Sequence, residues 1–212
     1  MSAHLPLEQP SARRCLPLAQ PGLAARLLAW REEQTLRKAL HLADEPGLVL
    51  DLPSGNGRFW PLLAEKPSRI IVAADPSAEA LREASALQHP AISRRVQPLH
   101  TTLLDIDLPD NCVDCIFSLD LISDIRDSML RMELLQEFHR VSRETAIVAL
   151  RTDGNLAALS RRWMHEQDQQ APLPLPGSRV EREFVAAGFS IQQRLQPLAF
   201  LSSRCIYVLR KL

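Results

Sequence analysis

The sequence predicts an α/β fold, in which a mostly parallel β-sheet lies between two layers of helices. Residues 48–51 and 69–75 are apolar runs of strand length, and each run ends in an acid. A glycine turn and a helical pattern follow the first run, and a capped helical pattern follows the second. Because strands that alternate with helices are typical of a parallel sheet, these observations set the fold class.

Length, composition and charge narrow the possible functions. The 212 residues are 46% apolar, which is enough for one domain with its own core, and we expect that domain to span 22–212. Lysine plus arginine and aspartate plus glutamate each number 25, so the formal net charge is zero. The totals show no basic footprint for nucleic acid, so DNA is not expected as a partner and an RNA substrate is disfavoured.

The first part of the chain predicts an arm and then a helix. Residues 1–21 contain four prolines and no long apolar run, which predicts a proline-rich arm without a secretory signal or a membrane span. A helix is expected over 23–42, and Pro46 and Gly47 end it. Its apolar face consists of Leu23, Leu27, Trp30, Leu36, Ala39 and Leu40.

The loop after the first strand is the expected binding site. Gly55 and Gly57 can adopt positive φ and lack a Cβ, so the turn can bend sharply and a ligand can approach the main chain. A helix that begins at about Gly57 would point its unpaired amide groups at the loop, where a carboxylate or phosphate is favoured. Asp51, at the end of the strand, could accept hydrogen bonds from ammonium or hydroxyl groups. The loop therefore suits a ligand that carries both charges.

Asp75 ends the second strand, about where a dinucleotide fold places its ribose-binding carboxylate. The glycine spacing argues against a nicotinamide site, because Trp60 occupies the position of the third small residue of G-x-G-x-x-G. Pro76 and Ser77 begin a short helix over 76–88, and a third strand is expected over 96–104.

The fourth strand contains Cys112 and Cys115. Residues three apart in a strand point to opposite faces, so the two sulfurs cannot easily share a metal or a disulfide. No second cysteine pair or Cys/His cluster with ligand spacing accompanies them, so no metal site is predicted. The remaining cysteines are isolated, which suits a reducing cytoplasm.

The later elements complete the sheet and its second helical layer. Capping residues at Asp127 and Ser128 and an apolar stripe predict a helix over 127–141. A fifth strand is expected over 145–152, a helix over 156–165, and a proline-rich loop or lid over 165–178. A helix over 179–187, closed by Gly188, then leads to two final strands over 189–195 and 203–209.

Three motifs together resemble one family. Asp51-x-x-x-Gly55-x-Gly57 followed by Asp75 looks like the cofactor motif of class I S-adenosylmethionine-dependent methyltransferases. The segment 107–118, Asp-Leu-Pro-Asp-Asn-Cys-Val-Asp-Cys-Ile-Phe-Ser, is similar to the one that leads into strand four in the methyltransferase-11 type, which includes ubiquinone and menaquinone methylases. The segment that begins at Glu133, within the helix expected over 127–141, also resembles that type, and the likeness covers about 46–152.

The resemblance implies a Rossmann-like three-layer sandwich with a seven-stranded, mostly parallel sheet and an antiparallel last strand. It implies S-adenosylmethionine as cofactor, S-adenosylhomocysteine as product, and in-line methyl transfer to a small-molecule or lipid-linked acceptor. Arg31 and Arg37 become candidates for the methionine carboxylate. The implied cofactor-binding residues are Asp51, Gly55, Asn56, Gly57, Asp75, Pro76, Leu104, Asp105, Ser118 and Leu119.

The sequence departs from that family at two places. Leu104 stands where the resembling enzymes usually carry an acid for the adenine amino group, so Asp105 or the backbone would make this contact. Many relatives have Leu-His-His after strand four, and no histidine stands there in this chain. Asp120, Asp124 and His139 are the remaining candidates for a general base, and none of them is assigned a catalytic role.

These departures leave other functions open. A noncatalytic cofactor-binding partner of another enzyme would keep Asp51 and Asp75 without turnover. A nicotinamide oxidoreductase would need a small residue at Trp60, and an RNA methyltransferase would need a basic face. The identity of the acceptor does not follow from the sequence.

Overall fold

The computed structural model describes residues 22–152, 175–197 and 204–212 of the chain. The predicted arm at 1–21, the predicted helix at 156–165 and most of the predicted loop or lid at 165–178 lie outside the described residues.

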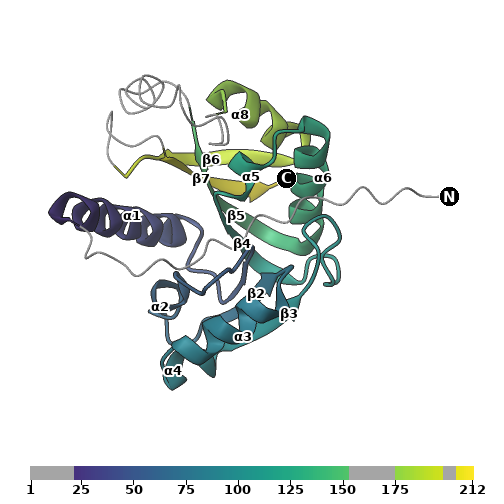
Figure 1. The fold of residues 1–212 in the computed structure, drawn as a ribbon. Coiled ribbons are helices and arrows are strands. Elements are labelled where there is room, and N and C mark those ends of the chain that lie inside the picture. The colour runs from purple at the N-terminus through teal and green to yellow at the C-terminus, as the bar shows by residue number, and fades with distance from the viewer. Residues whose placement is uncertain (1–21, 153–174, 198–203) are drawn as a thin grey trace.

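The described strands form one seven-stranded sheet in the order β3-β2-β1-β4-β5-β7-β6 (Figure 1). Neighbouring strands from β3 to β5 run parallel, whereas β7 is antiparallel to both β5 and β6. The predicted mostly parallel sheet with an antiparallel last strand is therefore confirmed. The strands are β1 (Leu48–Asp51), β2 (Ile70–Asp75), β3 (Val96–His100), β4 (Val113–Leu119), β5 (Ser142–Arg151), β6 (Phe189–Leu195) and β7 (Arg204–Lys211).

Helices cover both faces of this sheet (Figure 1). Buried side chains of α1, α2 and α3 pack on one face, and those of α5, α6 and α8 pack on the other. The three layers confirm the predicted architecture. The helices are α1 (Leu23–Leu42), α2 (Trp60–Leu63), α3 (Ala78–Leu87), α4 (Pro90–Ser93), α5 (Leu121–Asp124), α6 (Ser128–Val141) and α8 (Gly177–Ala186).

The central strands are apolar because both of their faces are buried. Val49 and Leu50 of β1 belong to opposite cores, as do Cys115 and Ile116 of β4. Side chains alternate between the two faces of a strand, so a strand covered on both sides needs a continuous apolar run. Cys112 directly precedes β4 and does not belong to it as predicted, and it packs against the core opposite to that of Cys115.

The predicted strand over 96–104 is shorter in the structure, where β3 ends at His100. The hydroxyl of Thr101 donates to the carbonyl of Asp105, and the amide of Asp105 donates to the hydroxyl of Thr102. Threonine side chains that bond the nearby backbone compete with the strand ladder. They turn the chain here and leave the following residues outside the sheet.

Helix α1 has the predicted bounds, but only its second half is buried. Leu36, Ala39 and Leu40 belong to the core, whereas Leu27 and Trp30 are 54% and 51% exposed. A helix of 20 residues is about 30 Å long, and its first half extends past the sheet in Figure 1. Among the described residues, no helix is long and apolar enough to cross a membrane.

Candidate active site

The carboxyl ends of β1, β2 and β4 meet at one edge of the sheet, where open α/β folds bind their ligands. Asp51 ends β1 and Asp75 ends β2, and both side chains are almost completely buried. The two acids that the sequence predicted for the site thus lie at the ends of adjacent strands.

The loop between Asp51 and α2 has the predicted glycine geometry, with φ values of 54° at Gly55 and 69° at Gly57. The two glycines differ in what surrounds them. A Cβ at Gly55 would meet nothing within 4 Å, so a ligand can approach the backbone on that side. A Cβ at Gly57 would lie only 2.8 Å from the ring of Trp60, so this position needs glycine because an indole packs against it.

The carboxylate of Asp75 ties the loop to β2. Its Oδ2 accepts a hydrogen bond of 2.9 Å from the amide of Gly55, and its Oδ1 accepts one of 2.8 Å from the amide of Ser77. Each carboxylate oxygen can accept more than one bond, so both retain acceptor capacity for a ligand.

Asp51 is held through one of its two oxygens. Its Oδ2 accepts from the hydroxyl of Ser54 at 2.8 Å and from the indole Nε1 of Trp60 at 3.1 Å. None of the described residues donates a hydrogen bond to its Oδ1. Burial raises the pKa of this carboxyl from its usual 3.8 to about 7, against the opposing effect of the two donors.

The helix after the loop differs from the prediction. α2 begins at Trp60 rather than at about Gly57, and it is four residues long. Asn56 explains part of the difference, because its Oδ1 accepts from the amide of Arg58 and its side chain thereby stabilises a turn before the helix. The predicted helix start at about Gly57 is therefore wrong, and binding of an anionic group by this loop stays a prediction.

Ser118 and Leu119 lie at the end of β4, the strand that pairs with β1 next to Asp51. The hydroxyl of Ser118 is completely buried, and no described residue hydrogen-bonds it. Such a group is costly unless it finds a partner. Leu119 is half-buried and packs against the core under α1.

A network of four charged side chains, which the sequence did not predict, lies over this edge. Glu32 of α1 pairs with Arg58 of the loop at 2.9 Å, and it also pairs with Arg204 of β7. Arg204 in turn pairs with Asp120, which follows β4 and adopts a φ of 66°. The network fastens α1 to the carboxyl ends of the strands. Its members are far apart in the sequence, so no local pattern indicated it.

Two arginines of α1 have other partners than the one implied by the resemblance. Arg37 makes a bidentate ion pair with Glu65, with contacts of 2.8 Å and 2.6 Å. The guanidinium of Arg31 lies over the ring of Trp30 at 5.6 Å. Trp30 belongs to the exposed half of the helix, and Glu65 follows α2.

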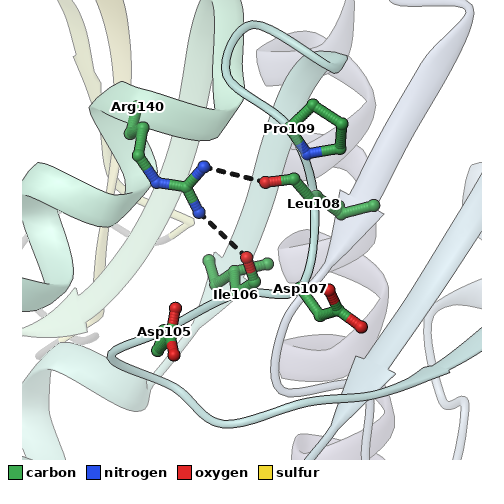
Figure 2. A pocket seen from close by; sticks show the side chains of 6 residues that line it. All are labelled: Asp105, Ile106, Asp107, Leu108, Pro109 and Arg140. Atoms are coloured by element: carbon green, nitrogen blue, oxygen red, sulfur yellow. Dashed lines mark hydrogen bonds between the residues drawn. The ribbon is translucent and has the colours of Figure 1, made fainter.

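Leu104 and Asp105 lie in the turn after β3. Leu104 is half-buried against the core, and Asp105 is exposed. Asp105 lines a hollow of about 460 Å³. Figure 2 shows it with Arg140, near the end of α6, among the residues that line this hollow. Arg140 donates to the carbonyls of Ile106 and Leu108, so its guanidinium fixes the backbone of this segment. Pro76 is exposed beside Asp75, and its carbonyl lies 3.0 Å from His100 Nε2.

His139 lies at the opposite edge of the sheet. Its ring packs edge-on against Phe189 with a centroid distance of 5.4 Å, and it lies where a Cβ of Gly188 would be. Burial lowers the pKa of this histidine. It is a packing residue and not a base for this site.

The other two candidates for a general base are Asp120 and Asp124. Asp120 is ion-paired with Arg204, and Asp124 is exposed at the end of α5. The described residues contain no cluster of three or more side chains suited to hold a metal ion.

Known proteins are similar to this chain both in sequence, over the region that contains the glycine loop, and in fold. The methyltransferase domain family matches residues 49–145, which include β1, the glycine loop, β2 and β4. The matched family and the structural neighbours are class I S-adenosylmethionine-dependent methyltransferases, which is the resemblance that the motifs predicted. No curated protein sequence matches the chain significantly.

Solved structures share the fold of this chain at low sequence identity. Magnesium protoporphyrin IX methyltransferase (ChlM) from Synechocystis PCC 6803 with bound S-adenosylhomocysteine has a TM-score of 0.69 and 14% identity, over 92% of this chain and 90% of that chain. The mitomycin 7-O-methyltransferase MmcR has a TM-score of 0.71 and 14% identity, over 89% and 55%. A methyltransferase in complex with the Haloferax volcanii Trm112 activator has a TM-score of 0.63 and 16% identity, over 89% and 93%.

S-adenosylmethionine is the cofactor of this family. Three features of the site suit a cofactor of this kind. Oδ1 of Asp51 accepts nothing from the described residues, the space beside Gly55 is open, and the buried hydroxyl of Ser118 has no described partner.

Proposed function

We propose that this chain is a methyltransferase, which binds S-adenosylmethionine at the glycine loop and transfers its methyl group directly to a small-molecule or lipid-linked acceptor. The observation that carries the proposal is the pair of buried acids, Asp51 and Asp75, on either side of a loop whose two glycines have positive φ. The names of two structural neighbours, ChlM and MmcR, refer to small-molecule acceptors, which supports the same class here.

Each site residue then has a proposed role. Asp51, with Gly55, Asn56 and Gly57 around it, would bind the amino-acid end of the cofactor. Asp75, with Pro76 beside it, would bind the ribose hydroxyls. The remaining positions, which would line the adenine, are Leu104, Asp105, Ser118 and Leu119.

The chemistry asks little of the protein beyond alignment. The sulfonium of the bound cofactor supplies an electrophilic methyl group, so the chain mainly has to orient the acceptor in line and exclude water. Asp120 is ion-paired with Arg204, and His139 lies at the other edge of the sheet. We therefore propose transfer without a histidine base, to an acceptor atom that is nucleophilic at neutral pH.

Calorimetric titration with S-adenosylhomocysteine, with NAD run in parallel, tests the proposal. We expect binding of S-adenosylhomocysteine alone, because Trp60 fills the position where a nicotinamide loop needs a small residue. Binding of NAD alone, or of neither ligand, would contradict the proposal. Once binding is established, transfer of labelled methyl groups from S-adenosylmethionine to panels of small molecules and lipids tests the acceptor class.

A second candidate is a noncatalytic, cofactor-binding partner of another enzyme. The ion-paired Asp120 favours it, and so does the absence of a histidine after β4. A structural neighbour that is complexed with an activator protein also supports a partner. This candidate predicts that the chain binds S-adenosylhomocysteine but methylates no acceptor unless a partner protein is added. In either case we expect a cytoplasmic protein, because the described cysteines are free thiols.

A further inference from the structure

Trp60 lies directly under the glycine loop and contacts both the loop and Asp51. Its side chain is completely buried, and its Nε1 donates to Asp51 Oδ2 at 3.1 Å and to Ser54 Oγ at 2.8 Å. Ser54 donates from its hydroxyl to the same carboxylate oxygen. Indole, serine and carboxylate thus form a closed buried triangle in which Oδ2 receives two hydrogen bonds.

The triangle occupies Oδ2 of Asp51, so a ligand would contact the other oxygen of this carboxylate. Two donors on Oδ2 fix the rotation of the group, and Oδ1, which receives no bond from the described residues, is the oxygen that remains for a ligand. An indole nitrogen is a donor only, so it can stabilise an acceptor oxygen and cannot compete for the ligand's protons.

We propose that Trp60 is a positioning residue for cofactor binding, which orients Asp51 so that its Oδ1 meets the ammonium group of the cofactor. The inference rests on the proposed function. The ring also sets the loop, because Gly57 packs on it so closely that a Cβ would lie 2.8–2.9 Å from three ring atoms. In a nicotinamide loop this position is small and serves packing alone, whereas here it adds a hydrogen-bond donor.

The test compares the affinity for S-adenosylhomocysteine across pH 6 to 8.5 in the wild type, Trp60→Phe and Trp30→Phe. Phenylalanine keeps most of the ring and removes the N–H. Trp30 is the matched control, since it lies on the exposed half of α1. In the wild type we expect affinity to rise with pH as Asp51 ionises, with a midpoint near its raised pKa of about 7.

For Trp60→Phe we expect the same rise at a higher pH, because the carboxylate has lost one donor. The affinity should be about tenfold weaker near pH 6.5 and should approach that of the wild type by pH 8.5. Trp30→Phe should follow the wild type throughout. A Trp60→Phe loss that is equal at every pH would show that the ring only packs, and it would overturn the inference, as would no loss at all.

The experiment also distinguishes failure of the proposed function from failure of the variant to fold. A wild type that binds no S-adenosylhomocysteine at any pH overturns the proposed function, and the inference with it. If Trp60→Phe does not fold, the fluorescence of Trp60 in the Trp30→Phe, Trp163→Phe background replaces it, since Trp60 is then the sole tryptophan of the chain. We expect a pH transition in that fluorescence that Asp51→Asn abolishes, and the absence of the transition would overturn the inference.

Discussion

Asp75 combines two tasks at the end of β2. Its carboxylate accepts hydrogen bonds from the amides of Gly55 and Ser77, and it is the proposed partner of the ribose hydroxyls. The side chain therefore shapes the loop before any ligand arrives and then completes the site.

Asp75→Ala is expected to weaken binding of S-adenosylhomocysteine by about 1–3 kcal/mol, because it removes the ribose partner and leaves two loop amides without their acceptor. Calorimetric titration of the variant measures the loss. Asp110→Ala is the control, since Asp110 makes only an exposed ion pair with Arg140. Equal affinities of Asp75→Ala and the wild type would move the ribose contact to another residue.

The positions of some site residues could be predicted from the sequence, whereas their side-chain contacts could not. Asp51 and Asp75 could be placed because an acid directly after a buried strand must lie at the edge of the sheet. The contact between Trp60 and Asp51 could not be predicted, since the direction of the indole depends on the exact path of the loop. The pair of Asp120 and Arg204 joins residues 84 apart, and only the assembled sheet brings them together.

At the scale of elements, α1 divides into a core half and an exposed half. The apolar positions of α1 follow one helical face. Such a pattern predicts the helix and its apolar face, but it does not predict how much of that face the sheet covers. Ends of elements were predicted well where a local residue sets them, as with Pro46 and Gly47 after α1 or Gly188 after α8. The end of β3 depended on threonine hydroxyls that bond the backbone, and it was predicted too late in the chain.

A leucine-to-alanine substitution should have a much larger effect on stability in the second half of α1 than in the first half. Leu36→Ala should lower the free energy of unfolding by about 2–5 kcal/mol, because it opens a cavity in the core. Leu27→Ala, on the same helix, should change it by no more than about 0.5 kcal/mol. Urea denaturation followed by circular dichroism measures both. A comparable loss in Leu27→Ala would indicate that the first half of α1 is covered in solution.

At the scale of the whole molecule, Asp51 links stability to pH. Its folded-state pKa of about 7 lies above the usual 3.8, so the folded state binds more protons than the unfolded state between these values. The contribution of this carboxyl to the free energy of unfolding therefore falls as the pH rises from about 4 to 7, and it is constant above that.

Asp51→Asn should remove that dependence. We expect the stability difference between variant and wild type to change by a few kcal/mol, on the order expected for a shift of this size, between pH 5 and pH 8 in favour of the variant. Urea denaturation at both pH values gives the two differences, with Asp110→Asn as a control for an exposed acid. A difference that is the same at both pH values would mean that Asp51 has an ordinary pKa in the folded protein.

The position of β7 between β5 and β6 also constrains how the chain is made. β5 pairs with β4 on one side only until β7 arrives, and β6 pairs with β7 alone in the described sheet. β7 follows both strands in the sequence, so a ribosome releases β5 and β6 before the strand that joins them. An open strand edge is a template for pairing with other chains. The nascent protein therefore exposes the edge of β5 to pairing with other chains until β7 inserts.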